Sequence, residues 1–189
     1  MRIISGKFKN KKLFFPKNLS TRPLKDSVRE SIFNILEHSN NFNIKIKNSN
    51  ILDLYAGSGS FGFECISREA AEVLFVERDN EAINNLQKNT INLKIINQSK
   101  IFSMDIENFF KKTLFKKKYH IIFFDPPYKD YEYKRIFKII IKKNILDKEH
   151  IVIIHREKNA EESMDECLNI IEKRTYGRSE IFFANFFWY

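Results

Sequence analysis

Residues 121–128 read IIFFDPPY, and the rest of the chain is interpreted outward from this stretch. Four apolar residues, two of them β-branched, are typical of a fully buried strand, and the prolines end it because proline donates no hydrogen bond to a sheet. The prolines also hold Asp125 extended, so its carboxylate, the Asp125 and Pro126 carbonyls and the Tyr128 ring share a small space. Acceptors beside an aromatic ring suit a flat substrate that carries an amino group. The alternative is purely structural, since a buried strand that leaves its sheet at Asp-Pro would have the same sequence.

Strand-like and helix-like segments alternate on both sides of this stretch. Strands are predicted at 51–56, 73–78, 99–105, 121–125 and 150–157, and helices at 59–70, 80–92, 106–117 and 132–143. Such alternation produces a parallel sheet with helices on both faces. Residues 169–189 are interpreted as two more strands joined at Tyr176-Gly177-Arg178. We therefore predict an α/β fold with a Rossmann-like, mostly parallel seven-stranded sheet that ends in an antiparallel hairpin.

The N-terminal part of the chain has a different pattern. A short basic β-hairpin is predicted at residues 2–15, followed by a helix that Asp26 or Ser27 can cap. An Asn-rich connector, 39–50, follows this helix. We therefore divide the chain into an N-terminal appendage, residues 1–40, and a main domain, residues 41–189.

Composition narrows the class of partner. The chain has 33 Lys and Arg residues against 24 Asp and Glu residues, a net charge of +9 and a pI near 9.4. Nucleic acid is the first candidate partner of such a chain, although a bias toward Lys, Asn, Ile and Phe produces the same charge. The widely separated Cys65 and Cys167 favour reduced thiols. With no signal peptide or membrane-spanning stretch in the sequence, we expect a cytoplasmic protein, and the spacing of its histidines predicts no metal site.

A glycine-rich turn follows the first strand of the alternating region. Residues 53–62 read DLYAGSGSFG, and such glycines let a ligand approach the backbone at a helix N-terminus. The spacing also fits the GxGxxG pattern of a dinucleotide site. In that pattern the first glycine follows the strand directly, whereas here Asp53 and three further residues intervene. Glycines that serve only the turn are the simplest alternative.

Three successive predicted strands carry an acid at or near their ends, namely Asp53, Glu77 and Asp105. Together they suit a ligand with an amino acid end, a ribose and an adenine, which is S-adenosylmethionine. Glu77 would accept hydrogen bonds from both ribose hydroxyls. Asp79 is interpreted as a helix cap, and Asp105 either accepts from the adenine amino group or caps the next helix.

These motifs resemble the bacterial small-subunit ribosomal RNA guanine-N2 methyltransferase family (RsmD-like), one of the Rossmann-like S-adenosylmethionine methyltransferases. The resemblance runs through RIISGKFKNKKL, TRPLKDSVRESIFNIL, LDLYAGSGSFGFECISREA, FVERD, FFDPPY and RTYGRSEIFF. Asn10 and Glu69 stand where the family usually has glycine, Leu24 where threonine is common and Ser27 where a basic residue is usual.

The resemblance implies an enzyme that transfers a methyl group from S-adenosylmethionine to the exocyclic N2 of a guanine in small-subunit (16S) ribosomal RNA. It assigns catalysis to Asp125, Pro126, Pro127 and Tyr128, cofactor binding to Asp53, Tyr55, Ala56, Gly57, Ser58, Gly59, Glu77, Arg78, Asp105, Thr21, Arg22 and Pro23, and RNA binding to Arg2, Lys7, Lys9, Lys11, Lys12 and Arg22. The expected partner is ribosomal RNA in the small subunit, and these basic residues are expected on the same side of the sheet as the pocket of Asp125, because ligands bind at the carboxyl ends of the strands in this architecture. The expected state is a monomer. An adenine-N6 methyltransferase and a non-catalytic RNA-binding assembly factor are the alternatives.

Overall fold

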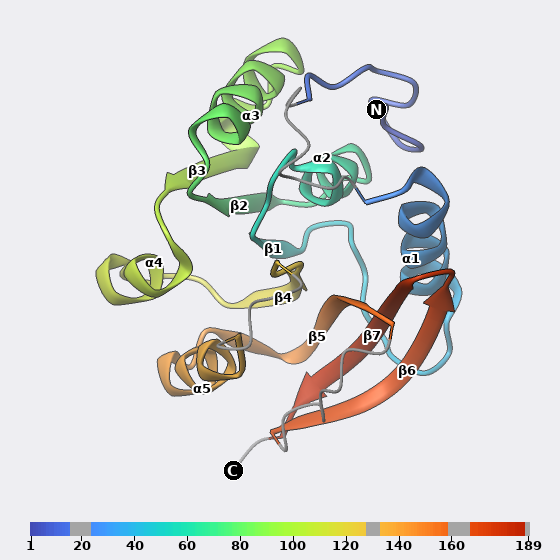
Figure 1. Cartoon of the computed structure of the whole chain (residues 1–189), viewed down its shortest axis with the longest axis vertical. Helices are drawn as coiled ribbons and strands as arrows, with labels where there is room; N and C mark the ends of the chain where they lie inside the picture. Colours follow the sequence, from blue (N-terminus) through green and yellow to red (C-terminus); the bar gives the residue numbers. More distant parts are fainter. Residues whose placement is uncertain (16–23, 128–132, 159–166, 188–189) are drawn as a thin grey trace.

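The computed structural model describes residues 1–15, 24–127, 133–158 and 167–187 (Figure 1). Its helices are α1 (Asp26–His38), α2 (Ser60–Ser67), α3 (Asn80–Asn92), α4 (Ile106–Lys112) and α5 (Tyr133–Lys143), with a short 3-10 helix, η1 (Ile96–Gln98). Its strands are β1 (Asn50–Leu54), β2 (Glu72–Glu77), β3 (Ser99–Ser103), β4 (Tyr119–Phe124), β5 (Leu146–Glu157), β6 (Leu168–Tyr176) and β7 (Ser179–Phe186). None of the helices in these ranges is long and apolar enough to cross a membrane.

The seven strands form one sheet in the order β3-β2-β1-β4-β5-β7-β6. The strands from β3 to β5 pair in parallel, whereas β7 is antiparallel to both β5 and β6. The predicted seven-stranded, mostly parallel sheet with a C-terminal antiparallel hairpin is confirmed. The largest differences in boundary are that β5 begins at Leu146 instead of residue 150, that α4 ends at Lys112 instead of residue 117 and that α2 ends at Ser67 instead of residue 70.

Helices cover both faces of this sheet, as its buried strands require (Figure 1). On one face α1, α2 and α3 enclose a hydrophobic cluster that includes Phe33 and Phe61, whose rings stack at 5.2 Å between centroids. On the other face α4 and α5 enclose a second cluster that includes Phe109 and Phe137. Since α1 shares its cluster with the sheet, the packing is continuous across residue 40, and the division of the chain there stays a prediction.

The predicted N-terminal β-hairpin is a chain reversal without strands. Its arms form one isolated bridge, between Arg2 and Lys12, and backbone hydrogen bonds join Ile3 to Lys11, Asn10 to Ile3 and Leu13 to Met1, but no ladder of strand length forms. The amides of Ile4 and Ser5 donate to the buried carboxylate of Glu64 in α2, at 2.7 and 2.9 Å. Because these amides bond to a helix side chain, they cannot extend a ladder between the arms.

The tip of this N-terminal segment closes the C-terminal end of α2. The Lys7 amide donates to the Ser67 carbonyl at 2.8 Å, and the Phe8 amide donates to the Ser67 hydroxyl at 2.9 Å. Gly6 has φ +77°, and a Cβ there would lie 2.0 Å from the same carbonyl oxygen. The last carbonyls of a helix have no donor within it, so the tip supplies one.

Two residues that depart from the family pattern lie in the left-handed backbone region. Asn10 and Glu69, at positions where the family usually has glycine, have φ of 68° and 69°, a region that disfavours side chains.

The predicted cap of α1 is wrong: Lys25 is the N-cap residue and makes no side-chain cap bond. Asp26 lies inside the helix, where its carboxylate binds the buried guanidinium of Arg29 at 3.0 Å.

Candidate functional site

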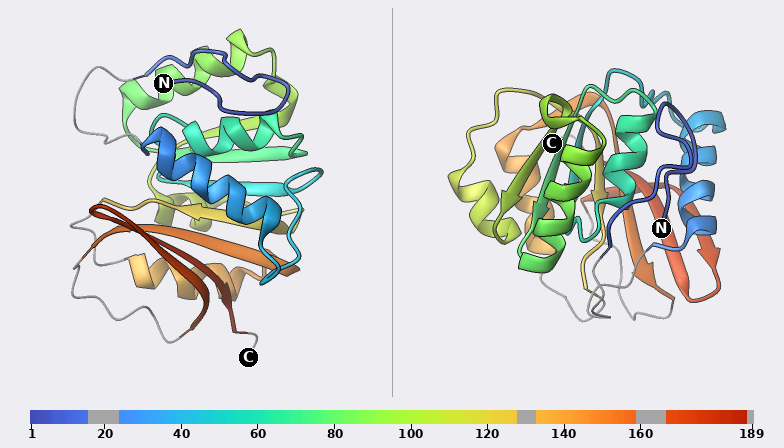
Figure 2. Two further views of the ribbon diagram at one scale, coloured as in Figure 1. Left: turned by 90° about the vertical axis from the view of Figure 1, so that its right-hand side faces the viewer. Right: turned by 90° about the horizontal axis from the view of Figure 1, so that it is seen from above.

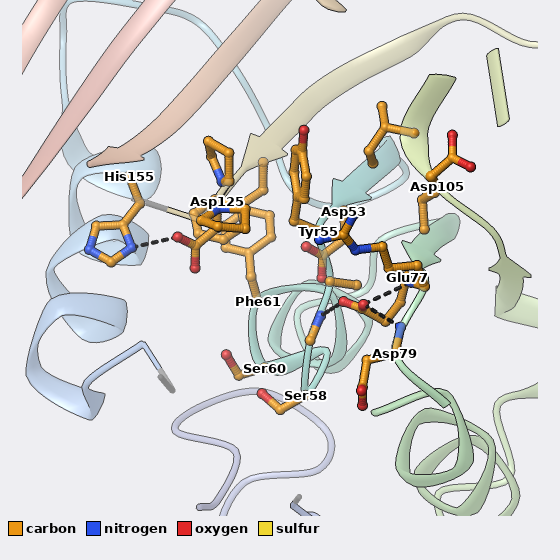
Figure 3. Close-up of a pocket in the computed structure, with 18 of the residues that line it drawn as sticks. Asp53, Tyr55, Ser58, Ser60, Phe61, Glu77, Asp79, Asp105, Asp125 and His155 are labelled. Atoms are coloured by element: carbon orange, nitrogen blue, oxygen red, sulfur yellow. Dashed lines mark hydrogen bonds and ion pairs between the residues drawn. The ribbon is translucent and has the colours of Figure 1, made fainter. Parts of the chain in front are cut away.

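A pocket of about 630 Å³ opens where the parallel strands end (Figure 3). Its wall comes from the residues at or after the carboxyl ends of β1, β2, β3, β4 and β5. In an open α/β sheet these ends meet at one edge, which is where ligands bind. The volume lies in the range of about 300 to 1,000 Å³ that is usual for small-molecule sites.

The two glycines of the turn after β1 have different tasks. Gly57 lies on the pocket wall with φ 52°. Gly59, with φ 71°, lies outside the set of lining residues, and a Cβ there would come within 2.4 Å of the Leu86 side chain in α3. One glycine therefore exposes backbone to a ligand, and the other permits close packing beneath the turn.

Glu77 is bonded to backbone amides on both of its carboxylate oxygens. Oε2 accepts from the Gly57 amide at 2.7 Å, and Oε1 accepts from the amides of Arg78 and Asp79 at 2.7 and 2.9 Å. Figure 3 shows these three bonds converging on one side chain. A carboxylate offers about four acceptor sites, so about one is left for a ligand hydroxyl. Glu77 thus shapes the pocket as well as lining it.

Asp53 is the most deeply enclosed acid of the pocket wall, with 1% of its surface exposed. Its Oδ2 accepts from the Gly62 amide at 3.0 Å. Burial raises the pKa of Asp53 well above its ordinary value, the Gly62 bond opposes this, and the negative charges of Asp125 and Glu77 add to the rise. A cationic group bound beside Asp53 would favour its ionised form.

Asp79 and Asp105 cap the helices that begin after them. Asp79 accepts from the Ala82 amide at 2.9 Å, which confirms the predicted cap of α3. Asp105 accepts from the Asn108 amide at 2.8 Å, a bond that lowers the pKa of Asp105. Both acids also line the pocket, so capping and ligand binding are compatible roles.

Asp125 meets a histidine from the neighbouring strand. Phe124 at the end of β4 pairs with Ile154 in β5, which brings the next residues, Asp125 and His155, side by side. His155 Nδ1 lies 2.8 Å from Asp125 Oδ1 (Figure 3). The histidine side chain is 8% exposed and the aspartate side chain 24% exposed, so the carboxylate is the more accessible of the two, although both residues line the pocket.

The residue after this histidine holds the proline segment from β5 as well. The buried Arg156 donates from its guanidinium to the Pro127 carbonyl at 3.2 Å. Successive residues of a strand point to opposite faces, so His155 and Arg156 reach the segment from two sides. Asp125, Pro126 and Pro127 are thereby held by the strand next to their own.

Most of the residues predicted for the site line this one pocket. They are Asp53, Tyr55, Ala56, Gly57, Ser58, Glu77, Arg78, Asp105, Asp125, Pro126 and Pro127. Thr21, Arg22, Pro23 and Tyr128 lie outside the described residues.

The basic residues of the N-terminal segment are placed differently from the expectation. Arg2, Lys7, Lys9, Lys11 and Lys12 are exposed, and none of them lines the pocket. The segment runs along α2 away from the pocket, because α2 begins at the pocket with Ser60 and ends at Ser67, where the tip is bound (Figure 2). The expectation that the whole basic segment flanks the pocket is therefore wrong for its tip.

Several pocket residues were not assigned to the site from the sequence. Phe15, Leu24, Phe61, Met104, Ile106, Phe123, Ile136 and His155 all line the wall. His155 was detectable in principle, because it lies near the carboxyl end of the strand that follows the Asp125 strand, and the carboxyl ends of parallel strands meet at one edge. Within the described ranges, no three His, Cys, Asp or Glu side chains lie close enough to hold a metal ion.

Comparisons with known proteins agree with this geometry. Residues 1–185 match the family described as "Conserved hypothetical protein 95". The ribosomal RNA small subunit methyltransferase D of Buchnera aphidicola subsp. Baizongia pistaciae is 36% identical over 157 residues, 83% of this chain and 76% of that protein. Its namesake from Haemophilus influenzae is 30% identical over 178 residues, 94% of this chain and 89% of that protein.

A solved structure extends the likeness to the fold. The Escherichia coli protein yhhF superposes with a TM-score of 0.81 at 26% identity, and the match covers 97% of this chain and 96% of that one. The match therefore includes the N-terminal segment and the C-terminal hairpin as well as the parallel strands. The chain belongs to the conserved hypothetical protein 95 family and is an RsmD-like methyltransferase.

Proposed function

We propose that this chain transfers a methyl group from S-adenosylmethionine to the exocyclic N2 of a guanine in small-subunit ribosomal RNA. The observation that carries the proposal is a single cavity with two different walls. One wall holds the glycine turn with Glu77, and the other holds Asp125 with its prolines. A cofactor on the first wall and an amino group on the second would share one space of about 630 Å³.

The first wall suits S-adenosylmethionine by its donor and acceptor set. Glu77 has acceptor capacity left for a ribose hydroxyl, Asp53 suits an ammonium group, and Asp105 lines the same wall with carboxylate oxygens that could accept from an adenine amino group. The apolar side chains of Met104 and Ile106 flank Asp105 in the sequence and line the same wall, which suits a flat base. When bound, the cofactor supplies an electrophilic sulfonium methyl group.

The second wall suits the nitrogen that receives the methyl group. The Asp125 carboxylate and the Pro126 carbonyl can accept its two hydrogens, which favours a nucleophilic nitrogen and stabilises the positive charge that develops on it. The main task of the chain is to hold that nitrogen in line with the bond between the sulfur and the methyl group of the cofactor, since no covalent nucleophile is needed. His155 and Arg156 keep the acceptors in place.

The names of the relatives point to ribosomal RNA as the substrate class. A base inside a duplex or stack cannot reach the Asp125 wall, so the target must leave its stack at a cost of a few kcal/mol. The net charge of +9 favours association with a polyanion. We further propose that the protein acts as a monomer in the cytoplasm.

The test is methylation of small ribosomal subunits that lack the modification, with labelled S-adenosylmethionine and nucleoside analysis of the product. N2-methylguanosine is the expected product. N6-methyladenosine would replace the guanine assignment with the adenine one, and a wild-type chain that binds subunits without incorporating label would favour an assembly factor.

A further inference from the structure

His155 lies beside the methyl-accepting wall without any motif to mark it. It follows Ile154, which pairs with Phe124, so the sheet register sets it level with Asp125. Its Nδ1 is 2.8 Å from Asp125 Oδ1. The position thus comes from the parallel pairing of β4 and β5, and not from a flexible loop.

The chemistry of the pair assigns the direction of the bond. An aspartate carboxylate only accepts hydrogen bonds, so the imidazole must donate its Nδ1–H to Oδ1. The bond fixes the rotation of the carboxylate, and Oδ2 is the oxygen that the imidazole does not use. Figure 3 shows that oxygen turned away from the ring.

We propose that His155 is a positioning residue for methyl transfer, which acts by holding the Asp125 carboxylate so that its second oxygen accepts from the amino group of the base. This inference rests on the proposed function. A purely structural role, in which the ring only fills space in the core, is the competing interpretation. The two differ in what a substitution does to kcat when the fold is retained.

Two substitutions separate these roles. His155→Asn keeps an N–H donor near the place of Nδ1, whereas His155→Phe keeps the ring and removes the donor. We expect His155→Phe to lower kcat by about 10- to 100-fold, because a loosened acceptor misplaces the amino nitrogen. His155→Asn should recover most of this loss, and the KM for S-adenosylmethionine should stay near the wild-type value in both.

The matched control is His150, a second buried histidine in β5. It lies toward the other end of the strand, where its Nε2 accepts from the Phe186 amide at 3.0 Å. His150→Phe should lower thermal stability and leave kcat near wild type. This control shows what the loss of a buried histidine does when Asp125 is not its partner.

A substrate-free readout comes from nitrogen NMR of the imidazole. In the wild type we expect His155 to carry its proton on Nδ1, and Asp125→Ala should change that signal. A wild-type Nδ1 without a proton, a kcat in His155→Phe equal to wild type, or a His155→Asn variant as impaired as His155→Phe would each overturn the assignment. A wild-type chain without any transfer would instead remove the proposed function, while the NMR result would still report the bond.

Discussion

The two walls of the pocket hold their acids by different means. On the wall formed after β1, β2 and β3, here the cofactor wall, Glu77, Asp79 and Asp105 each accept from backbone amides that follow them closely in the sequence, and Glu77 also accepts from the Gly57 amide, 20 residues earlier. On the wall formed after β4 and β5, here the acceptor wall, Asp125 accepts from the side chain of His155, 30 residues further along the chain.

Because of this difference, substitutions on the two walls should affect different properties of the protein. An acid that binds backbone amides holds the loops together, so its removal disturbs both the pocket and the fold. An acid that binds one side chain can be changed with less effect on the backbone. Substitutions on the acceptor wall should therefore act mainly on turnover, and substitutions on the cofactor wall on binding and stability together.

The largest effect is expected from Asp125→Ala. Loss of the acceptor for the developing charge should lower kcat by about two to three orders of magnitude, as the removal of one stabilising group does in other active sites. Cofactor affinity, measured by calorimetry, should change by only a few fold. The matched control is Asp147→Ala, which removes an acid near the start of β5. Retained turnover in Asp125→Ala would contradict the acceptor role.

Glu77→Ala should have a smaller effect, on the affinity for S-adenosylmethionine instead of on kcat. The loss of a buried acceptor costs about 1 to 3 kcal/mol, so affinity for S-adenosylmethionine should fall roughly 10- to 100-fold in calorimetry. The thermal midpoint should fall too, because the amides of Gly57, Arg78 and Asp79 lose their acceptor.

Glu77→Gln is the control for this prediction, since an amide oxygen still accepts from the backbone. It should lose less stability than Glu77→Ala. If Glu77→Ala bound the cofactor as wild type does, the assignment of Glu77 to the cofactor wall would fail. If Asp125→Ala lost as much stability as Glu77→Ala, the contrast between the two walls would fail.

Asp53 is the buried acid of the cofactor wall, and the negative charge of Asp125 on the acceptor wall adds to the rise of its pKa. Burial raises the pKa of Asp53, so the folded protein holds this proton more tightly than the unfolded chain does. The free energy of unfolding should therefore fall as pH rises from the ordinary aspartate value toward the raised one. Asp53→Asn removes this titration, and the variant should gain stability relative to wild type across that window.

The measurement is urea unfolding of the cofactor-free protein over a pH series. Gly62→Ala is unsuitable as a control, because a Cβ there would lie 2.3 Å from the Phe75 ring. Glu107→Gln is suitable, since this acid lines the pocket and lies on the surface of α4 in a pair with Lys111. Parallel pH curves for wild type and Asp53→Asn would show that burial does not hold the proton.

The smallest effect concerns two basic turns at opposite ends of the sheet. Lys7 and Lys9 lie at the tip beside Ser67. Lys158 follows β5 and Arg178 precedes β7, at the edge of the sheet where the pocket opens, and the Lys158 amide donates to the Arg178 carbonyl at 2.7 Å. Replacing Lys158 and Arg178 with Ser should weaken binding to small subunits and reduce the slope of log affinity against log salt by about 0.9 for each phosphate that the protein no longer neutralises.

Replacing Lys7 and Lys9 with Ser is the matched variant. It makes the same change of charge at the end of α2 that lies away from the pocket. It should leave the slope near wild type, because exposed charges are screened beyond about 10 Å. A larger change from Lys7 and Lys9 would show that the RNA reaches along the N-terminal segment, as the resemblance to the family implies. Cofactor affinity should not change in either variant.

The alternation of buried runs with amphipathic ones was enough to predict the sheet, its helices on both faces and its closing hairpin. The cofactor wall was also largely predictable, because a glycine turn and a cap such as Asp79 depend on residues within one turn of each other. The prediction of strands at the N-terminus was wrong because side chains of α2 bond the same amides. Local propensity does not reveal that Glu64 accepts from Ile4 and Ser5.

By itself, then, the sequence determined the order of elements, the edge at which the acids gather and the identity of the Asp125 segment. Only the tertiary structure decided which strand lies beside β4, and therefore that His155 and Arg156 hold that segment. It also decided that the basic tip lies at the far end of α2. The physical reason is that caps and turns join neighbours in the chain, whereas these contacts join residues that only the pairing of strands and the packing of the N-terminal segment on α2 bring together.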